Sequence, residues 1–482
     1  MTEKFFTPIT VGIYFSGMLF IGWFTSYKVK NLTDFLVAGR KLGFILATAT
    51  MFATWFGAES VMGTAATVYK QGLKGVIADP FGASLALILA GLFYAVAFYK
   101  LKLLTVVEVF GLHYNKKLET FATLLMLPVY IGWLGAQIVA IGYIFSVFTQ
   151  LPPNLGMILG TAVVLIYTLT GGMWAVTITD FFQMIILIVG IIAILPFVLK
   201  NAGGLIHILH STPKEFFNFL PEKNTFSMWS TFLGKWFIIG LGCVVGQDLI
   251  QRSLSSKNEF VARWSAIVAG IIYFVLGIVI ITIGLASRII LPDIETPELL
   301  IPILAKKFLF ELHPFIFSIF ICGLLAAIMS SADSSLLAGV SLFVNNIVYK
   351  NFPTLSEKTL LLLNRISTVI FTILSMFTAL YIQQIYNLMV NSWATLLVAI
   401  LVPSTVALFM KKYVNIYSGW ISMISGIVVW LGYIFITTKK FVIDDTTMDY
   451  FYSASLFGFL ASIFGYFISY NIIKLLKKFN KQ

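Results

Sequence analysis

The chain carries very little charge for its length. Only 11% of its 482 residues are Asp, Glu, Lys or Arg, whereas 59% are hydrophobic. Soluble domains average about one quarter charged residues. This composition excludes an ordinary soluble fold and predicts an all-α polytopic membrane protein. No short cleavable signal with a basic start precedes the first apolar run, so we expect the first helix to be retained.

Cysteine and histidine are also scarce. The two cysteines, Cys243 and Cys322, both fall inside apolar segments, which argues against a disulfide scaffold and against a zinc site. The four histidines lie in predicted loops, which argues against haem ligation and a membrane histidine relay. The apolar segments hold no nucleophile paired with histidine and no HExxH pattern. We therefore expect no catalytic residues and no enzymatic activity.

Long apolar runs dominate the chain and predict thirteen membrane-spanning helices in a single membrane domain. Their approximate ranges are 7–27, 42–66, 76–98, 119–148, 155–173, 177–199, 229–250, 261–287, 315–347, 359–382, 387–410, 415–437 and 448–472. An odd number of crossings places the two ends of the chain on opposite sides of the membrane.

The distribution of basic residues predicts the orientation. Of the 32 Lys and Arg residues, 20 fall in one alternating set of loops and 11 in the other, with the loop after the seventh span taken to start at residue 251. Since cytoplasmic loops collect positive charge, we expect the N-terminus outside and the C-terminus in the cytoplasm of a cell (plasma or inner) membrane. The net charge of +12 then needs no nucleic acid, and no obligate protein partner is evident.

The segment 323–340, GLLAAIMSSADSSLLAGV, puts polar side chains inside an apolar span. On a helix Ser330, Asp333 and Ser334 share one face, with Ser331 at its edge. A carboxylate at the bilayer centre costs roughly 2.5–3.5 kcal/mol on insertion scales, which favours a functional role. Clustered hard oxygens suit a small hard cation. The alternative is that the serines serve as small helix-packing residues.

Two spans look internally interrupted. The second contains Gly57, Glu59 and Gly63, and the seventh has three glycines between residues 240 and 246. Each opens a set of five spans, and an odd count makes two such sets insert with opposite orientation. The predicted layout is a peripheral helix at 7–27, repeat 1 at 42–199, repeat 2 at 229–410 and two peripheral helices within 415–472. Interrupted helices at corresponding places predict a transport site near the middle of the membrane.

Five stretches carry a family resemblance: DFLVAGRKLG, ATWFGAESVMGT, TLTGGMWAVTITDFFQ, QRSLSS and AAIMSSADSSLL. Between about residues 34 and 403 the chain resembles the sodium/solute symporter family. Its combination of ATW, a tryptophan within the fourth span and SSADSS looks most like the high-affinity choline transporter branch. The resemblance implies the LeuT-type fold, with two inverted five-helix repeats, and sodium-coupled symport by alternating access.

The resemblance also implies ion-binding residues. The sodium site would consist of backbone carbonyls and serine hydroxyls, from Ala53, Phe56, Ala327, Ser330 and Ser331. Five neutral oxygens suit a monovalent ion. Some members hold a second sodium, and the matching positions are Asp180, Ser330, Asp333 and Ser334. Because Asp333 replaces a family serine, it is open whether it binds an ion, takes a proton or only forms hydrogen bonds. An alternative role for Asp180 is to cap a helix N-terminus.

For the substrate, the helix faces converge on residues of the second, fourth, seventh and eleventh spans. These are Trp55, Glu59, Ser60, Trp133, Gln137, Gln247 and Asn391. In the choline branch aromatic rings enclose a quaternary ammonium by cation–π attraction. This chain departs from that cage, with Gly246 and Ala83 where the branch has a tryptophan and a tyrosine. Glu59 either faces an amine or bonds neighbouring helix backbone, and the two tryptophans either form a cage or pack.

The function predicted is a sodium-coupled symporter that imports a small organic solute, choline or another amine, with sodium as the co-transported ion. One sodium crossing 100 mV contributes about 2.3 kcal/mol and a tenfold gradient about 1.4 kcal/mol, which together support roughly 500-fold accumulation. The alternatives are a proton-coupled symporter of a neutral amino acid, pantothenate or sugar, acting through Asp333 or Glu59, and a passive channel.

Overall fold

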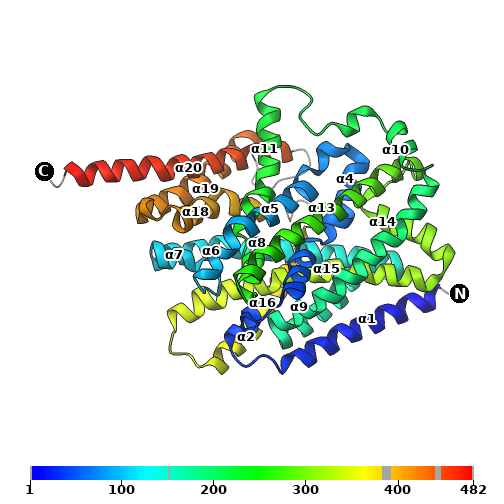
Figure 1. Ribbon diagram of the computed structural model, residues 1–482, viewed down its shortest axis with the longest axis horizontal. Coiled ribbons are helices and arrows are strands. Elements are labelled where there is room, and N and C mark those ends of the chain that lie inside the picture. The colour runs from blue at the N-terminus through cyan, green and yellow to red at the C-terminus, as the bar shows by residue number, and fades with distance from the viewer. Residues whose placement is uncertain (1–2, 150–151, 383–391, 440–446, 480–482) are drawn as a thin grey trace.

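The chain is helical almost throughout (Figure 1). A computed structural model describes residues 3–149, 152–382, 392–439 and 447–479. Within those ranges the one extended contact is a bridge between Leu42 and Ser256. The all-α membrane architecture expected from the composition is therefore confirmed.

The described residues contain eleven helices that are long and apolar enough to cross a membrane, or twelve if one bent pair counts as a span. The long single helices are α1 (Glu3–Ser26), α8 (Lys116–Thr149), α9 (Pro153–Asn201), α13 (Glu259–Ile290), α15 (Pro314–Phe343), α16 (Glu357–Tyr381), α19 (Ile416–Thr438) and α20 (Met448–Phe479). One further span combines η4 (Ile77–Gly82), α5 (Ala83–Leu89), η5 (Ala90–Tyr94) and α6 (Ala95–Lys100), and another combines η11 (Leu396–Ile400) with α18 (Leu401–Phe409). Short helices α7 (Glu108–His113), α10 (Leu205–Ser211) and α14 (Leu300–Ala305) lie between spans.

Helix α9 accounts for the difference from the predicted thirteen. It contains 49 residues, and a straight helix of that length would measure about 73 Å, more than twice the roughly 30 Å hydrocarbon core. Its backbone leaves helical geometry at Gly172, where φ is 51° and ψ is −140°. The two sides of Gly172 match the predicted fifth and sixth spans. The count of thirteen itself stays a prediction.

The first and last described helices lie at the periphery of the bundle. In Figure 1, α1 begins at one end of the longest axis and α20 finishes at the other. Helix α1 packs against α9 and α15, whereas α19 and α20 pack against each other. Their outer faces carry exposed aromatic side chains such as Phe20 and Phe464, as expected for contact with lipid.

The second span is broken, as predicted. Helix α3 (Phe44–Trp55) ends at Phe56, whose φ of −88° and ψ of 64° are not helical. The chain resumes in the π-helical turn η2 (Glu59–Gly63) and α4 (Thr64–Gln71), bent by 59° from α3. The break leaves the last carbonyls of α3 without partners from the next turn.

The seventh span is interrupted as well, but it continues as one span. Helix α11 (Phe226–Gly240) gives way to the 3-10 turn η7 (Gly242–Val245) and an extended Gly246, after which α12 (Gln247–Ser255) begins. The expected loop start at residue 251 is wrong, because α12 extends to Ser255. Arg252 therefore lies fully inside the protein rather than in a solvated loop.

Helix α15 is the centre of the bundle. It contacts α1, α3, α8, α9, α12 and α16, and its residues 320–342 are buried without a gap. Such packing is required because hydroxyl and carboxyl groups facing lipid would have no hydrogen-bond partners. The serine-rich segment is consequently satisfied by protein atoms.

Candidate functional site

The break after α3 lies directly against the serines of α15. The Ser331 hydroxyl donates a hydrogen bond of 2.8 Å to the backbone carbonyl of Thr54. A Cβ on Gly57 would come within 2.3 Å of Ser331 Oγ, so the approach requires glycine at that position. The two segments predicted to hold sodium are thus brought together.

The oxygens at this junction suit a monovalent cation. The carbonyl of Trp55 lies 3.1 Å from the hydroxyl oxygens of both Ser60 and Tyr273. Among the described residues, no side chain donates to the carbonyls of Ala53 or Phe56, which remain available to an ion. All five predicted sodium ligands are buried: Ala53, Phe56, Ala327, Ser330 and Ser331. Their placement fits the prediction, while coordination of sodium by them stays a proposal.

Asp180 and Ser330 form a second polar cluster beside the first. The carboxylate of Asp180 accepts hydrogen bonds from the hydroxyls of Thr50 and Ser330. The interpretation of Asp180 as an N-cap is wrong, because α9 is helical on both sides of it and begins at Pro153. Asp180 therefore ties α9 to α3 and α15.

Asp333 is held by two donors. Tyr167 donates to Oδ2 at 2.6 Å and Ser334 donates to Oδ1 at 3.1 Å. These hydrogen bonds are compatible with all three roles left open for Asp333, so binding of an ion or a proton stays a proposal. Ser334 also lies 3.1 Å from the hydroxyl of Thr54, so the cluster reaches the broken helix.

Arg252 of α12 lies among these groups, a position the sequence analysis missed. Its guanidinium donates to Thr50 Oγ1 at 3.1 Å, to the carbonyl of Asp248 at 2.8 Å and to the Ser334 hydroxyl. It is 3.9 Å from Asp180 Oδ2, and both side chains are fully buried. Asp248 and Arg252 are four residues apart on one helix, a spacing that could have indicated a polar face turned inward.

Three tryptophans gather next to the break. The ring of Trp393 lies 5.8 Å from Trp55 of α3 and 4.9 Å from Trp133 of α8, edge to face in both cases. They surround a small cavity with about 20 Å³ of free space. The residues that line it are Trp55, Glu59, Asp79, Ala83, Trp133, Ile239, Cys243, Tyr273 and Trp393. That space holds one water molecule, so a larger ligand requires this region to open.

Glu59 points its carboxylate toward side chains rather than toward helix backbone. Gln137 donates to Oε2 at 2.9 Å and Trp133 donates to Oε1 at 3.4 Å. The role of Glu59 in facing an amine stays a prediction. The predicted residues Trp55, Glu59, Trp133 and Gln137 are therefore brought together.

Asp79 and Tyr273 belong to the same site but were not predicted. Asp79 Oδ2 accepts from Ser60 at 2.8 Å and from Tyr273 at 2.7 Å. Its Oδ1 is buried without a hydrogen-bond partner. An acid at the start of the apolar run 76–98 was the signal available in the sequence. Ser60, which was predicted, supports Asp79 from outside the cavity lining.

Asp248 fixes the orientation of Trp55. Trp55 Nε1 donates to Asp248 Oδ2 at 2.6 Å, and the Tyr130 hydroxyl donates to Oδ1 at 2.9 Å. Asp248 lies in the first turn of α12, two residues after the extended Gly246. Asp248 therefore holds the indole of Trp55 in its position at the cavity.

Gln247, another predicted substrate residue, does not line the cavity. Gln247 donates to the Ser341 hydroxyl at 3.0 Å and accepts from the backbone N–H of Val106 at 2.7 Å, so its amide is used elsewhere. Asn391 lies outside the described residues.

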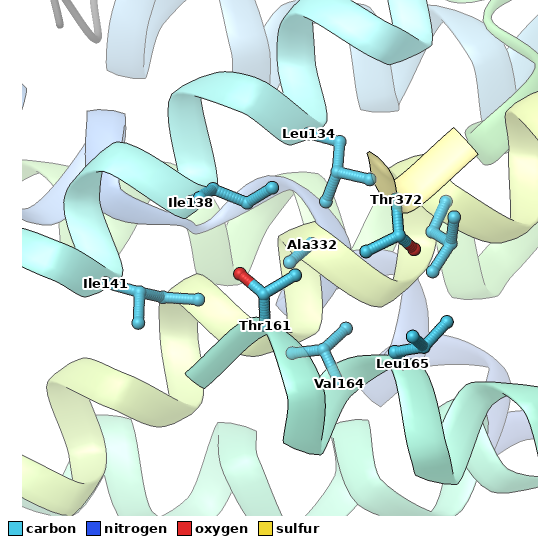
Figure 2. Close-up of a pocket in the computed structure, with 9 residues that line it drawn as sticks. Leu134, Ile138, Ile141, Thr161, Val164, Leu165, Ala332 and Thr372 are labelled. Atoms are coloured by element: carbon cyan, nitrogen blue, oxygen red, sulfur yellow. The ribbon is translucent and has the colours of Figure 1, made fainter. Parts of the chain in front are cut away.

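A second hollow lies between α8, α9, α15 and α16 (Figure 2). Its lining is aliphatic apart from Thr161 and Thr372, and it contains no charged side chain. In Figure 2 the side chains of Leu134, Ile138 and Val164 surround this space. A polar solute would gain no charge contact there, so the tryptophan-lined cavity is the better candidate for substrate.

The relatives of this chain are membrane transporters. The family model described as Sodium:solute symporter family matches residues 35–464. The human High affinity choline transporter 1 is 28% identical over 447 residues, covering 87% of this chain and 75% of the relative. The Osmoregulated proline transporter OpuE of Bacillus subtilis (strain 168) is 26% identical over 443 residues, covering 88% of each chain.

Solved structures support the fold. A Na⁺-coupled sialic acid symporter in a substrate-bound outward-open state has a TM-score of 0.80 at 20% identity, covering 96% of this chain and 97% of that one. The nucleobase-cation-symport-1 family transporter MHP1 has a TM-score of 0.58 at 16% identity, covering 90% and 95%. The expected LeuT-type fold is confirmed. The chain is a sodium-coupled symporter of small solutes and not an enzyme, and it belongs to the sodium:solute symporter family.

Proposed function

We propose that this symporter imports a small organic cation, choline or another amine, together with sodium. The observation that carries the proposal is the cavity in which Trp55, Trp133 and Trp393 meet the carboxylates of Glu59 and Asp79. Aromatic faces attract ammonium groups, and more strongly once water is excluded. Neither carboxylate forms an ion pair with a basic side chain of the described residues.

The sodium site proposed is the junction between the end of α3 and the middle of α15. Its ligands are the carbonyls of Ala53, Phe56 and Ala327 and the hydroxyls of Ser330 and Ser331. The contact of Ser331 with the Thr54 carbonyl supports this, since a hydroxyl that donates its proton keeps lone pairs for a cation. Trp55 and Glu59 belong to the same break, so an ion that orders the break also shapes the cavity.

A second cation is proposed at Asp180, Asp333 and Ser334, with a limit set by charge. The cluster holds two carboxylates, and the guanidinium of Arg252 already balances one of them. Buried charges require close compensation. The cluster therefore takes at most one further monovalent cation, either sodium or a proton at Asp333.

Transport would follow from alternating exposure of this midmembrane site. Repeats at 42–199 and 229–410 would rock against each other, with the N-terminus outside and the C-terminus in the cytoplasm. Sodium binding favours the outward-open state, and occupancy by both ligands permits the change.

Uptake into proteoliposomes tests the proposal. Labelled amine should accumulate under an inward sodium gradient and fail to accumulate when potassium replaces sodium at the same pH. Accumulation that needs a pH gradient and ignores sodium would establish the proton-coupled alternative. Flux that only equilibrates the amine would establish a channel.

A further inference from the structure

Asp79 presents one carboxylate oxygen that lacks a hydrogen-bond donor. Oδ2 accepts from both Ser60 and Tyr273, whereas Oδ1 is buried and unpartnered. Asp79 lines the tryptophan cavity. An unsatisfied buried acceptor is costly to a folded protein, and native proteins rarely keep one without a reason.

Most donor groups beside Asp79 are already engaged, and the Thr64 hydroxyl donates to the backbone carbonyls of Glu59 and Asp79, each at 3.4 Å. The indole N–H of Trp55 goes to Asp248 and that of Trp133 goes to Glu59. The hydroxyls of Ser60 and Tyr273 already serve the other oxygen of Asp79. We infer that the molecule that fills the cavity supplies the donor for Oδ1.

Water and ligands differ in how they meet this requirement. The cavity has about 20 Å³ of free space, so one water molecule can serve Oδ1 when no substrate is bound. A ligand that displaces an ordered water without reproducing its hydrogen bonds loses affinity. A quaternary ammonium group has no N–H and cannot replace that bond, whereas a protonated primary, secondary or tertiary amine can.

The charges point in the same direction. Glu59 and Asp79 both line the cavity, and two carboxylates that share an apolar site repel each other. A sodium ion at the proposed junction would balance one of the two charges. A cationic ligand that donates a charge-assisted hydrogen bond balances the other and fits Asp79 better than a ligand that only touches the rings.

We propose that the site selects protonated amines that keep an N–H, with Asp79 as the residue that determines this specificity. The inference rests on the amine transport proposed above and narrows it. The ammonium group of choline then contacts the rings without donating a hydrogen bond, and choline binds more weakly than its less methylated analogues, which share its hydroxyl.

The test uses four compounds that differ only in the number of methyl groups on the nitrogen, each of which replaces one N–H. They are ethanolamine, N-methylethanolamine, N,N-dimethylethanolamine and choline. Binding to the purified full chain is measured by calorimetry in sodium and, as a blank, in potassium. Each N–H-bearing amine should bind at least about tenfold more tightly than choline, since an unpaired buried acceptor carries a penalty of this size.

Asp79→Asn is the diagnostic variant. It keeps the shape of the side chain and removes its charge, so ethanolamine binding should weaken by about tenfold or more while choline binding changes less. The matched control is Glu298→Gln, which alters an exposed acid paired with Lys70 and should leave the order unchanged. The melting temperature without ligand checks that each variant folds. If Asp79→Asn does not fold, the order of the four affinities measured with the wild-type protein still tests the proposed specificity.

The outcomes separate the two proposals. Choline binding as tightly as ethanolamine, or more tightly, overturns the inference and leaves amine symport in place. If the four amines keep the same order of affinity in Asp79→Asn, the proposed role of Asp79 is overturned. If none of the four amines shows sodium-dependent binding, the proposed substrate class itself is overturned.

Discussion

The two interrupted spans look alike in sequence but differ in structure. The first break turns α4 by 59° from α3 and presents the carbonyl end of a helix. The second keeps α11 and α12 in one span and presents the N-terminus of α12. There the backbone N–H groups of Gln247 and Asp248 donate to the Tyr130 hydroxyl at 2.6 and 3.3 Å.

This difference assigns the two breaks different chemistry. A helix C-terminus offers free carbonyls and negative potential, which favour a cation, whereas an N-terminus offers N–H groups and favours acceptors. The first break therefore builds the proposed ion site. The second anchors Tyr130 and, through Asp248, the indole of Trp55, so it builds a wall of the substrate cavity.

The largest expected effect comes from the substitution of Arg252, because its guanidinium links α12 of the second break to α3, α9 and α15. Arg252→Met removes the charge and leaves Asp180 and Asp333 buried without compensation. Loss of one partner of a buried pair costs about 3–5 kcal/mol of folding free energy. Thermal unfolding should show a large fall in melting temperature.

The double variant Arg252→Met with Asp180→Asn checks the electrostatic cause. It removes one charge of each sign and should recover a substantial part of the stability. If the double variant is no more stable than Arg252→Met alone, the pair with Asp180 is not what Arg252 contributes.

Gly57→Ala should damage the first break, where the added Cβ would also come within 3.0 Å of Glu59 Oε2. The added Cβ would lie 2.3 Å from Ser331 Oγ and push α15 away from the Thr54 carbonyl. The sodium concentration for half-maximal uptake should rise by about 100-fold, equivalent to about 2.7 kcal/mol. Gly63→Ala on the same span is the control, since its nearest contact is Glu59 Cβ at 4.0 Å. Equal effects of the two substitutions would contradict the close approach.

Asp248→Asn should damage the second break alone. Trp55 loses a charge-assisted acceptor and the indole wall loosens, so amine binding should weaken by about tenfold. The sodium half-saturation should stay within about twofold of wild type. A larger change in the sodium half-saturation than in the amine affinity would contradict the assignment of sodium to the first break and of the cavity wall to the second.

Much of the architecture could be predicted from local sequence. Glycines within apolar runs marked both breaks, and the polar stretch around Ser330 marked the buried centre of the bundle. Trp55, Glu59, Trp133 and Gln137 also gather as expected. These features are local, because each depends on residue type and helical spacing.

The parts that could not be predicted depend on tertiary contacts. Hydropathy ended the seventh span before Arg252, since a charge lowers the average even where Asp180 of another helix balances it. Gln247 and Asp248 are adjacent, and only the rotation of α12 decides that Asp248 reaches Trp55 while Gln247 reaches Ser341. Asp79 resembled a boundary residue of its span, although its carboxylate lies at the cavity.

The central claim is that sodium binds between the end of α3 and α15, and Ser331→Ala tests it most directly with the smallest change. Sodium-dependent uptake is measured in proteoliposomes against sodium concentration at saturating amine. The account predicts that the sodium half-saturation rises by about tenfold or less while the maximal rate stays within about twofold, because one of five neutral ligands is lost. A half-saturation equal to that of wild type would contradict it.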